Sequence, residues 1–174
     1  MRGDEVDSLR RKELAMTETD IDKLLRSALV GRLGLCKDNE PYVVPLNYAY
    51  EKNHIYFHCA ETGTKMEYLH QNPAVCFEVD EHITTMTAPV PCDCSTVYRS
   101  VIVFGTAQIV TDLEEKAAAL RLIVTKYVGI ENAQKLGTAT VDRYRSGHGS
   151  KTMVVKITIK VITGKHYGIA QQET

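Results

Sequence analysis

The first third of the chain after the N-terminal segment consists of short alternating segments joined by polar turns of only a few residues. Between residues 30 and 59 three such segments follow one another, separated by Lys37-Asp38-Asn39-Glu40 and by Glu51-Lys52-Asn53. Alternation with a period of two is the pattern of a half-buried β-strand. In the second segment Tyr42, Val44, Leu46, Tyr48 and Tyr50 alternate onto one face. Connections this short join antiparallel neighbours, because parallel strands need a long crossover. The spacing therefore argues against a βαβ fold.

Longer segments complete the expected sheet. Strands are expected over residues 74–79, 97–110 and 151–161, with a bulge or bend at Gly105 in the second of them. Residues 81–96 are polar and are expected to form a long loop. About six antiparallel strands with short connections leave exposed edges unless the sheet closes on itself. The pattern therefore predicts a mainly β (α+β) fold, a small antiparallel barrel with peripheral helices.

Two of these helices lie in the first half of the chain. The first begins at Thr17 or Thr19 as N-cap. Its apolar face, at helical spacing, is Ile21, Leu24, Leu25 and Ala28. The second begins with the capping-box spacing Thr64-x-x-Glu67 and ends before Pro73.

A third helix follows the longest expected strand. Asp112 caps it and Gly129 stops it. Its expected apolar stripe is Leu113, Ala117, Leu120, Val124 and Tyr127. Residues 131–150 are expected to be helical in part and to end in the sequence Ser-Gly-His-Gly-Ser.

Composition narrows the function classes. With 174 residues the chain fits one domain, expected over residues 17–166, with tails at 1–16 and 167–174. The formal net charge of −1 favours neither nucleic acid nor an anionic membrane. No apolar run approaches the roughly 20 residues of a membrane span, and the N-terminal residues are too polar for a signal peptide. We expect a cytoplasmic protein.

Residues 58–65, His-Cys-Ala-Glu-Thr-Gly-Thr-Lys, carry the most informative chemical signal. A strand ends there, Gly63 permits a tight turn, and Thr64 opens a helix whose first amides have no intrahelical partner. Those amides favour an anion, and Lys65 adds an ammonium group whose charge opposes the helix dipole. A bound phosphate would compensate for that opposition. From spacing alone, an ordinary turn with a solvated lysine is the alternative.

The interrupted strand at Val43-Val44-Pro45-Leu46-Asn47 is a second candidate. Proline cannot donate to a strand ladder, so Pro45 belongs at an edge or beside something other than a strand. Asn47 places an amide side chain on the same face. A flat heteroaromatic ligand with hydrogen-bonding edges could use this interruption, and an edge strand with a turn-side Asn is the alternative reading.

Arg99 is the third candidate, because it lies inside an apolar strand and needs a partner. Ligand phosphate is one possible partner, and an acidic side chain such as Glu78 or Asp80 is another. Arg99 and Ser100 face opposite sides of the strand by alternation, so they need not serve one site.

The remaining histidine and cysteine residues give weaker signals. His58 is a candidate proton donor or ligand neighbour, with a packed core histidine as the alternative. Cys92-Asp-Cys94 is the only close cysteine pair, and C-x-C alone is a weak metal signal, so we expect no metal site.

The order of these segments resembles a known family. The segments that carry the likeness are residues 30–34, 41–48, 55–60, 72–79, 98–107 and 162–165, together with Gly63 and Lys65. They resemble the pyridoxamine 5′-phosphate oxidase-like split-barrel flavoproteins, and within these the nitroimidazole-resistance proteins. The likeness spans residues 20–165. Residues 42–47 depart from the Arg-x-Val-Leu-Leu-Lys stretch of true pyridoxamine phosphate oxidases, which argues against a B6 vitamer as substrate.

The resemblance implies a six-stranded split β-barrel that works as a homodimer with two FMN sites at the subunit interface. The implied cofactor contacts are Val44, Pro45, Leu46, Asn47, His58, Cys59, Ala60, Gly63, Thr64, Lys65, Arg99 and Ser100. Lys65 and Thr64 would contact the phosphate, whereas Arg99 and Ser100 would come from the other subunit. The segment Gly164-Lys165-His166 is a candidate to reach the site across the interface.

The expected function follows from this resemblance. We expect an FMN-dependent oxidoreductase that passes electrons from NAD(P)H to a small electrophile such as a nitroaromatic or nitroimidazole, with His58 as the catalytic proton donor. The alternative is a non-enzymatic flavin- or haem-binding protein of the same fold. A small-molecule substrate and a second copy of the chain are the expected partners, without nucleic acid or membrane.

Overall fold

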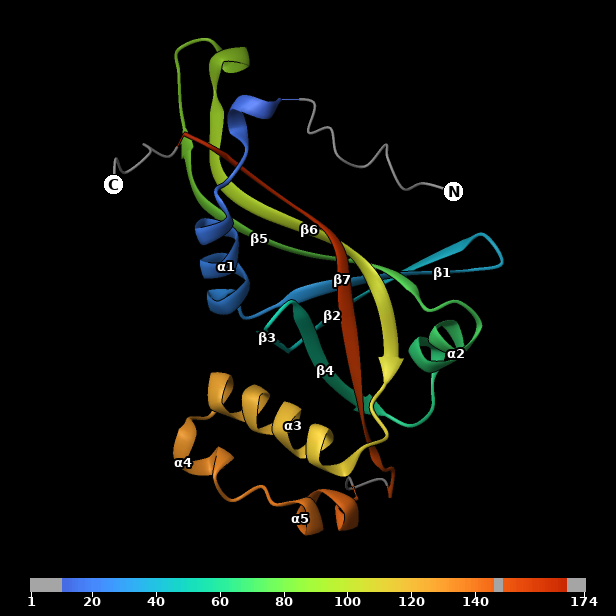
Figure 1. Ribbon diagram of the computed structural model, residues 1–174. Helices are drawn as coiled ribbons and strands as arrows, with labels where there is room; N and C mark the ends of the chain where they lie inside the picture. Colours follow the sequence, from blue (N-terminus) through green and yellow to red (C-terminus); the bar gives the residue numbers. More distant parts are fainter. Residues whose placement is uncertain (1–10, 146–148, 169–174) are drawn as a thin grey trace.

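In the computed structural model, which describes residues 11–145 and 149–168, the strands form one seven-stranded sheet in the order β2-β1-β5-β6-β7-β4-β3 (Figure 1). All pairings are antiparallel. The strands are β1 (Gly31–Lys37), β2 (Glu40–Leu46), β3 (Tyr48–Glu51), β4 (His54–Ala60), β5 (Ala74–Met86), β6 (Ser95–Ile109) and β7 (Thr152–Tyr167). The predicted fold class, an antiparallel split barrel with peripheral helices, is confirmed. The predicted number of six strands is too low, because the chain breaks at Asn47 into β2 and β3.

Both predicted tight turns are present in the structure. Asp38 and Asn39 have φ of 50° and 65°, and Lys52 and Asn53 have φ of 48° and 66°. Two consecutive residues at positive φ are the signature of a type I′ turn, whose twist matches that of the flanking strands. These turns fix the register of β1 with β2 and of β3 with β4.

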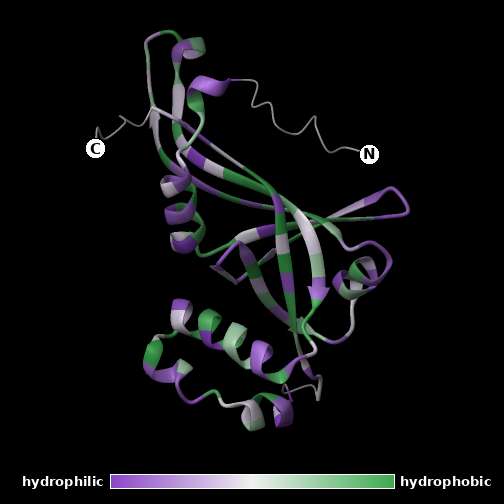
Figure 2. Ribbon diagram, in the orientation of Figure 1, coloured by the Kyte–Doolittle hydropathy of each residue, from purple (hydrophilic) through white to green (hydrophobic). Residues whose placement is uncertain are grey.

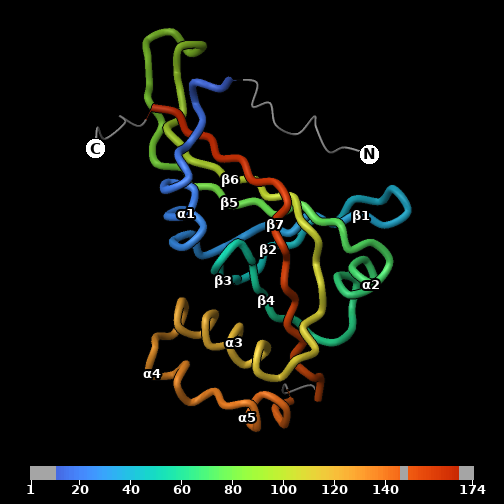
Figure 3. The backbone as a smooth tube through the Cα atoms, in the orientation of Figure 1, coloured from blue at the N-terminus to red at the C-terminus, as the bar shows by residue number. Residues whose placement is uncertain are grey.

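The long loop expected at residues 81–96 is wrong for most of its length. β5 continues to Met86 and β6 starts at Ser95, so the connection shrinks to eight residues that include the 3-10 turn η2 (Pro91–Asp93). Figure 3 shows this hairpin extending beyond the barrel. Residues 82–86 are exposed, so neither face imposes the apolar alternation that identifies a strand. The last strand is also longer than the expected 151–161, since it runs to Tyr167.

The helices surround the barrel. α1 (Glu18–Ser27) is capped by Thr17, whose hydroxyl accepts from the Asp20 amide at 3.1 Å. α2 (Thr64–Gln71) starts after Gly63 without any side-chain cap. The predicted capping box is therefore wrong, because Thr64 is the first helical residue and not the residue before it.

The helix α3 (Leu113–Tyr127) begins as predicted, with the Asp112 carboxylate accepting from the Glu115 amide at 2.8 Å. Its buried residues are Ala117, Ala119 and Ile123, whereas Leu113 is 41% exposed and does not belong to the buried stripe. With α4 (Ile130–Ala133) and α5 (Thr138–Arg143) it forms a separate layer at one end of the barrel (Figure 1). The expectation of partial helix after residue 130 is confirmed, while residues 146–148 lie outside the described ranges.

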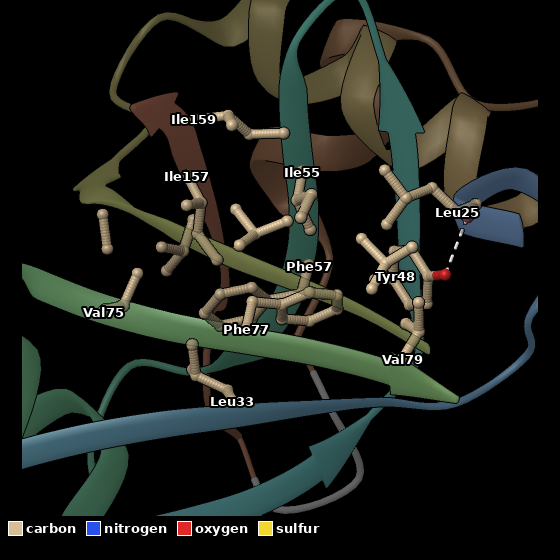
Figure 4. Close-up of a cluster of buried hydrophobic side chains, with 14 of the residues drawn as sticks. Leu25, Leu33, Tyr48, Ile55, Phe57, Val75, Phe77, Val79, Ile157 and Ile159 are labelled. Atoms are coloured by element: carbon tan, nitrogen blue, oxygen red, sulfur yellow. Dashed lines mark hydrogen bonds between the residues drawn. The ribbon is translucent and has the colours of Figure 1, made fainter. Parts of the chain in front are cut away.

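The core fills the barrel. Tyr48, Phe57 and Phe77 are its largest fully buried side chains, and the Tyr48 and Phe77 rings meet edge to face at 4.9 Å (Figure 4). Figure 2 shows hydrophobic and hydrophilic residues alternating along the strands, as expected for a sheet with one buried face. The predicted irregularity at Gly105 is confirmed by a register shift between Phe104 and Gly105.

The segment before α1 runs against the barrel. The 3-10 turn η1 (Lys12–Leu14) is followed by Ala15, which bridges to Lys165 of β7, and by Met16, which is buried. The remainder of the two predicted tails, residues 1–10 and 169–174, lies outside the described ranges. Among the described residues, no helix combines the length and apolarity needed to cross a membrane.

Candidate functional site

Two open strand edges meet at the split of the barrel. β2 pairs with β1 along its whole length, and within residues 11–145 and 149–168 no other strand pairs with it. β4 pairs with β7 from His54 to Ala60, but β3 covers only His54–Phe57 of its other edge. The β4 edge at residues 58–60 therefore has no described strand beside it. Asn47 connects β2 to Tyr48, whose register partner is Phe57, so the chain itself brings the two edges together.

Two prolines determine what the β2 edge offers. Pro41 is opposite Cys36 and Pro45 is opposite Arg32 in the β1–β2 register. Because proline cannot donate, both must occupy non-hydrogen-bonded positions, and Val43 between them has the same parity. The carbonyl groups of all three residues, but only the Val43 N–H, therefore point away from β1. This edge is rich in acceptors and cannot take up a further strand by a regular ladder.

The start of α2 lies beside this split. The amides of Met66 and Glu67 both donate to the Gly63 carbonyl, at 2.9 and 3.1 Å, which leaves the Thr64 and Lys65 amides without a helix-internal acceptor. Gly63 has a φ of 113°, and a Cβ built there would meet no atom within 4 Å. The Lys65 ammonium lies 5.5 Å from the Phe57 ring centroid. The turn thus combines two amides that have no helix-internal acceptor with one cation, next to the open space around Gly63.

His58 and Cys59 point to opposite faces of β4. Cys59 faces Met66 of α2, with 3.6 Å between the two sulfur atoms, and burial raises the pKa of its thiol. His58 keeps an exposed surface, yet the surrounding protein desolvates its ring and the Lys65 charge adds to the effect, so its pKa is lowered. The imidazole is therefore mainly neutral at pH 7.

Arg99 and Ser100 lie away from these groups within one chain. Arg99 is across from His166 on β7, whereas His58 is across from Val154, twelve residues earlier on the same strand. Twelve residues of strand span roughly 40 Å. The structure thus brings together the residues of β2, β4 and α2, whereas Arg99 and Ser100 lie on β6, three strands from β2 and at the far end of β7 from His58.

The partner of Arg99 is an acidic side chain, as one of the two alternatives proposed, but it is neither Glu78 nor Asp80. Arg99 donates to the Glu81 carboxylate through Nε at 2.9 Å and through Nη2. Glu78 and Asp80 instead pair with Arg32. The sequence does not identify Glu81 as the partner, because the polar pattern predicts a loop at residue 81 and only the extended β5–β6 register places it opposite Arg99.

Gly164, Lys165 and His166 belong to β7 and are across from Val101, Ser100 and Arg99. They share the far end of the sheet with Arg99. His166 Nδ1 is buried there without a hydrogen-bond partner among the described residues. No group of three or more His, Cys, Asp or Glu residues in the described ranges could hold a metal ion.

Comparison with known proteins gives the family context. Residues 17–166 match the family model described as pyridoxamine 5′-phosphate oxidase. A candidate 5-nitroimidazole antibiotic resistance protein from Bacteroides thetaiotaomicron is 25% identical, covers 87% of this chain and 85% of its own, and superposes with a TM-score of 0.67. The FAD binding protein from Mycobacterium smegmatis is 26% identical, covers 88% and 99%, and has a TM-score of 0.60.

Two further matches give weaker information about function, because one shares only the fold and the other covers only half of the chain. The flavocytochrome Anf3 from Azotobacter vinelandii shares the fold, with a TM-score of 0.79, 19% identity and coverage of 98% of this chain and 77% of that one. An uncharacterized protein of Rhizobium meliloti is 26% identical over 93 residues, which are 53% of this chain and 54% of that protein. The match thus spans only about half the length of that curated relative.

Proposed function

The chain belongs to the pyridoxamine 5′-phosphate oxidase family, and on this premise we propose that it binds FMN and acts as an oxidoreductase. The observation that carries the proposal is the meeting of two open strand edges with the uncapped start of α2 beside Lys65. An open edge holds a flat ligand by backbone hydrogen bonds, and an uncapped helix start with a cation holds a phosphate.

The residues present fit a flavin mononucleotide. The Thr64 and Lys65 amides and the Lys65 ammonium would hold its single phosphate next to Gly63. The segment of Val44, Pro45, Leu46 and Asn47 would lie on one side of the ring, with the outward-pointing Pro45 carbonyl among its contacts, and His58, Cys59 and Ala60 would lie on the other. The β2 edge offers acceptors and a single N–H, which suits a ring edge that carries both a donor and acceptors.

The proposed reaction is the reduction of a small electrophile such as a nitroimidazole by NAD(P)H. When bound, the flavin supplies hydride transfer. The strand edges orient the ring, and His58 donates a proton to the reduced product from its imidazolium form. The likeness to a candidate 5-nitroimidazole resistance protein supports this substrate class.

The complete site requires a second copy of the chain. Ser100 faces outward with Ile102 and Phe104, on a sheet face that also carries Arg32, Glu78, Asp80 and Lys165. Acidic and basic groups on one face allow two copies to meet about a twofold axis. Because Ser100 and Arg99 lie roughly 40 Å along β7 from the level of His58 in their own chain, we propose that they complete the partner's site.

An anaerobic absorption titration tests the cofactor. Purified protein is titrated with FMN, FAD, riboflavin and haemin. We expect a flavin spectrum with FMN bound at least tenfold more tightly than riboflavin. Replacing Lys65 by Met should remove most of this tenfold preference, because the substitution removes the phosphate contact. Tighter binding of haemin than of any flavin would overturn the assignment.

The pH profile tests His58 as proton donor. Turnover of a nitroimidazole with NAD(P)H should fall as the pH rises through the lowered pKa of His58, since only the imidazolium donates. Lys65→Met should move that inflection to higher pH, because the Lys65 charge contributes to the lowering. A His58→Ala variant with unchanged turnover and profile would show that His58 has no such role.

A further inference from the structure

The hydroxyl group of Tyr127, at the end of α3, joins three parts of the fold. It accepts a hydrogen bond from the Tyr48 amide at 3.0 Å. Its own proton points to the Leu29 carbonyl at 2.6 Å, with the Tyr48 carbonyl at 3.2 Å. The Tyr127 side chain thus occupies the hydrogen-bonding groups at Tyr48, the first residue on the open edge of β3. It also links β3 to the segment between α1 and β1.

Tyr48 is held on its other sides as well. Its side chain is fully buried, and its hydroxyl donates to the Leu25 carbonyl at 2.7 Å (Figure 4). One edge of the ring meets Phe77, and the Lys126 ammonium lies 3.7 Å from the ring centroid. Only the backbone of Tyr48 depends on Tyr127, because no strand covers that edge of β3.

The peptide bond that Tyr127 fixes is the one between Asn47 and Tyr48. Its N–H belongs to Tyr48, and its carbonyl belongs to Asn47, the break between β2 and β3. Among the described residues Asn47 has no strand partner and its side chain is exposed, so its position depends on its two neighbours, Leu46 in the β1–β2 register and Tyr48 in the β3–β4 register. A hydroxyl on α3 therefore holds the peptide bond that follows Asn47, the last residue of the proposed ring-binding segment.

We propose that Tyr127 is a positioning residue for the flavin ring, acting through the Asn47–Tyr48 peptide. This inference rests on the proposed function. It assigns to the α3 layer a part in cofactor binding, although α3 lies on the opposite face of β3 and β4 from the core. Tyr127 acts on the ring segment alone, whereas Lys65 acts on the phosphate.

The experiment compares Tyr127→Phe with Tyr144→Phe, a matched control at an exposed position of the same helical layer. Dissociation constants for FMN and riboflavin, and the visible spectrum of bound flavin, are measured for each. Without this hydrogen bond the Asn47–Tyr48 peptide is released in the free protein, and re-ordering it on binding costs at most the free energy of the bond, which corresponds to about a tenfold change. We expect Tyr127→Phe to weaken FMN and riboflavin by the same factor, about tenfold, and to shift the flavin absorption band. Tyr144→Phe should match the wild type.

A cofactor-independent readout accompanies it. Amide hydrogen exchange at Tyr48 should accelerate at least tenfold in Tyr127→Phe, while the amides of Ile55 and Phe57 keep their protection. If the variant is poorly folded, the same measurements are made in sucrose, which favours the folded state. Unchanged flavin constants and spectrum, or a loss confined to FMN, would overturn the inference. Wild-type protein that binds no flavin would overturn the proposed function itself. The exchange data would then show only that the Tyr127 hydroxyl holds the Tyr48 backbone.

Discussion

At the scale of single residues, proline and asparagine determine the character of the split. Pro41 and Pro45 occupy positions whose N–H would face away from β1, so they remove donors that would otherwise invite a further strand. Asn47 then ends β2 one residue before Tyr48, which returns to the core. Together these residues keep an edge open without leaving it available for strand addition.

The Lys126 ammonium is buried without a hydrogen-bond partner in the part of the chain that the structure describes, and it lies 3.7 Å from the Tyr48 ring centroid. Burial lowers its pKa to about 8. An unfolded lysine titrates near 10.4, so between these values the unfolded chain binds a proton that the folded chain does not. Stability of the wild type should therefore gain a contribution as the pH rises from about 8 to about 10.

Thermal unfolding of Lys126→Met tests this sign. The melting temperature of the wild type minus that of Lys126→Met should increase between pH 7.5 and pH 9.5, because only the wild type carries the desolvated ammonium. Lys135→Met, at an exposed lysine of the same helical layer, is the matched control for removal of a lysine charge. A pH-independent difference for Lys126→Met would contradict the assignment.

At the scale of elements, the bulge between β6 and β7 lets the sheet curl around the core. A Cβ on Gly105 would lie 2.5 Å from the Thr158 carbonyl oxygen and 2.8 Å from a methyl carbon of Ile157. The first neighbour is backbone and cannot move aside. Gly105→Ala should therefore destabilise the protein by about 1–3 kcal/mol in urea unfolding. Gly137→Ala, where a Cβ meets no atom within 4 Å, should change stability by less than about 0.5 kcal/mol.

The same elements show what a sequence can predict here. The β1–β4 hairpins and α3 follow from local chemistry, since turn residues at positive φ and an Asp cap act within a few residues. The β5–β6 extension carries no such signal, because its exposed residues take their register from the strands that precede and follow them. The candidate site is likewise predictable only in part. The Lys65 turn depends on neighbouring residues, whereas the Arg99–Glu81 pair and the Tyr127–Tyr48 hydrogen bond join residues that are separated in the sequence.

At the scale of the whole molecule, one face of the sheet carries exposed apolar side chains that no described part of the same chain covers. Val43 is 62% exposed, and Ile102 and Phe104 are each 39% exposed, on the outward side of β2 and β6. Phe104 lies in register with Cys76 and Val161, which extends an apolar row across three strands. Contiguous apolar surface of this kind marks an interaction site, and the proposed second copy is the occupant that also brings Ser100 to the split.

Phe104→Glu tests this arrangement, because it places a charge in the apolar row without touching the proposed flavin contacts. The wild type should sediment as a dimer of the 19.5 kDa chain, and the variant as a folded monomer with FMN affinity lowered at least tenfold. Val128→Glu introduces the same charge at an exposed valine of the helical layer and should leave both properties unchanged. A monomeric wild type that binds FMN tightly would mean that one chain completes the site, and the outward position of Ser100 would then require another explanation.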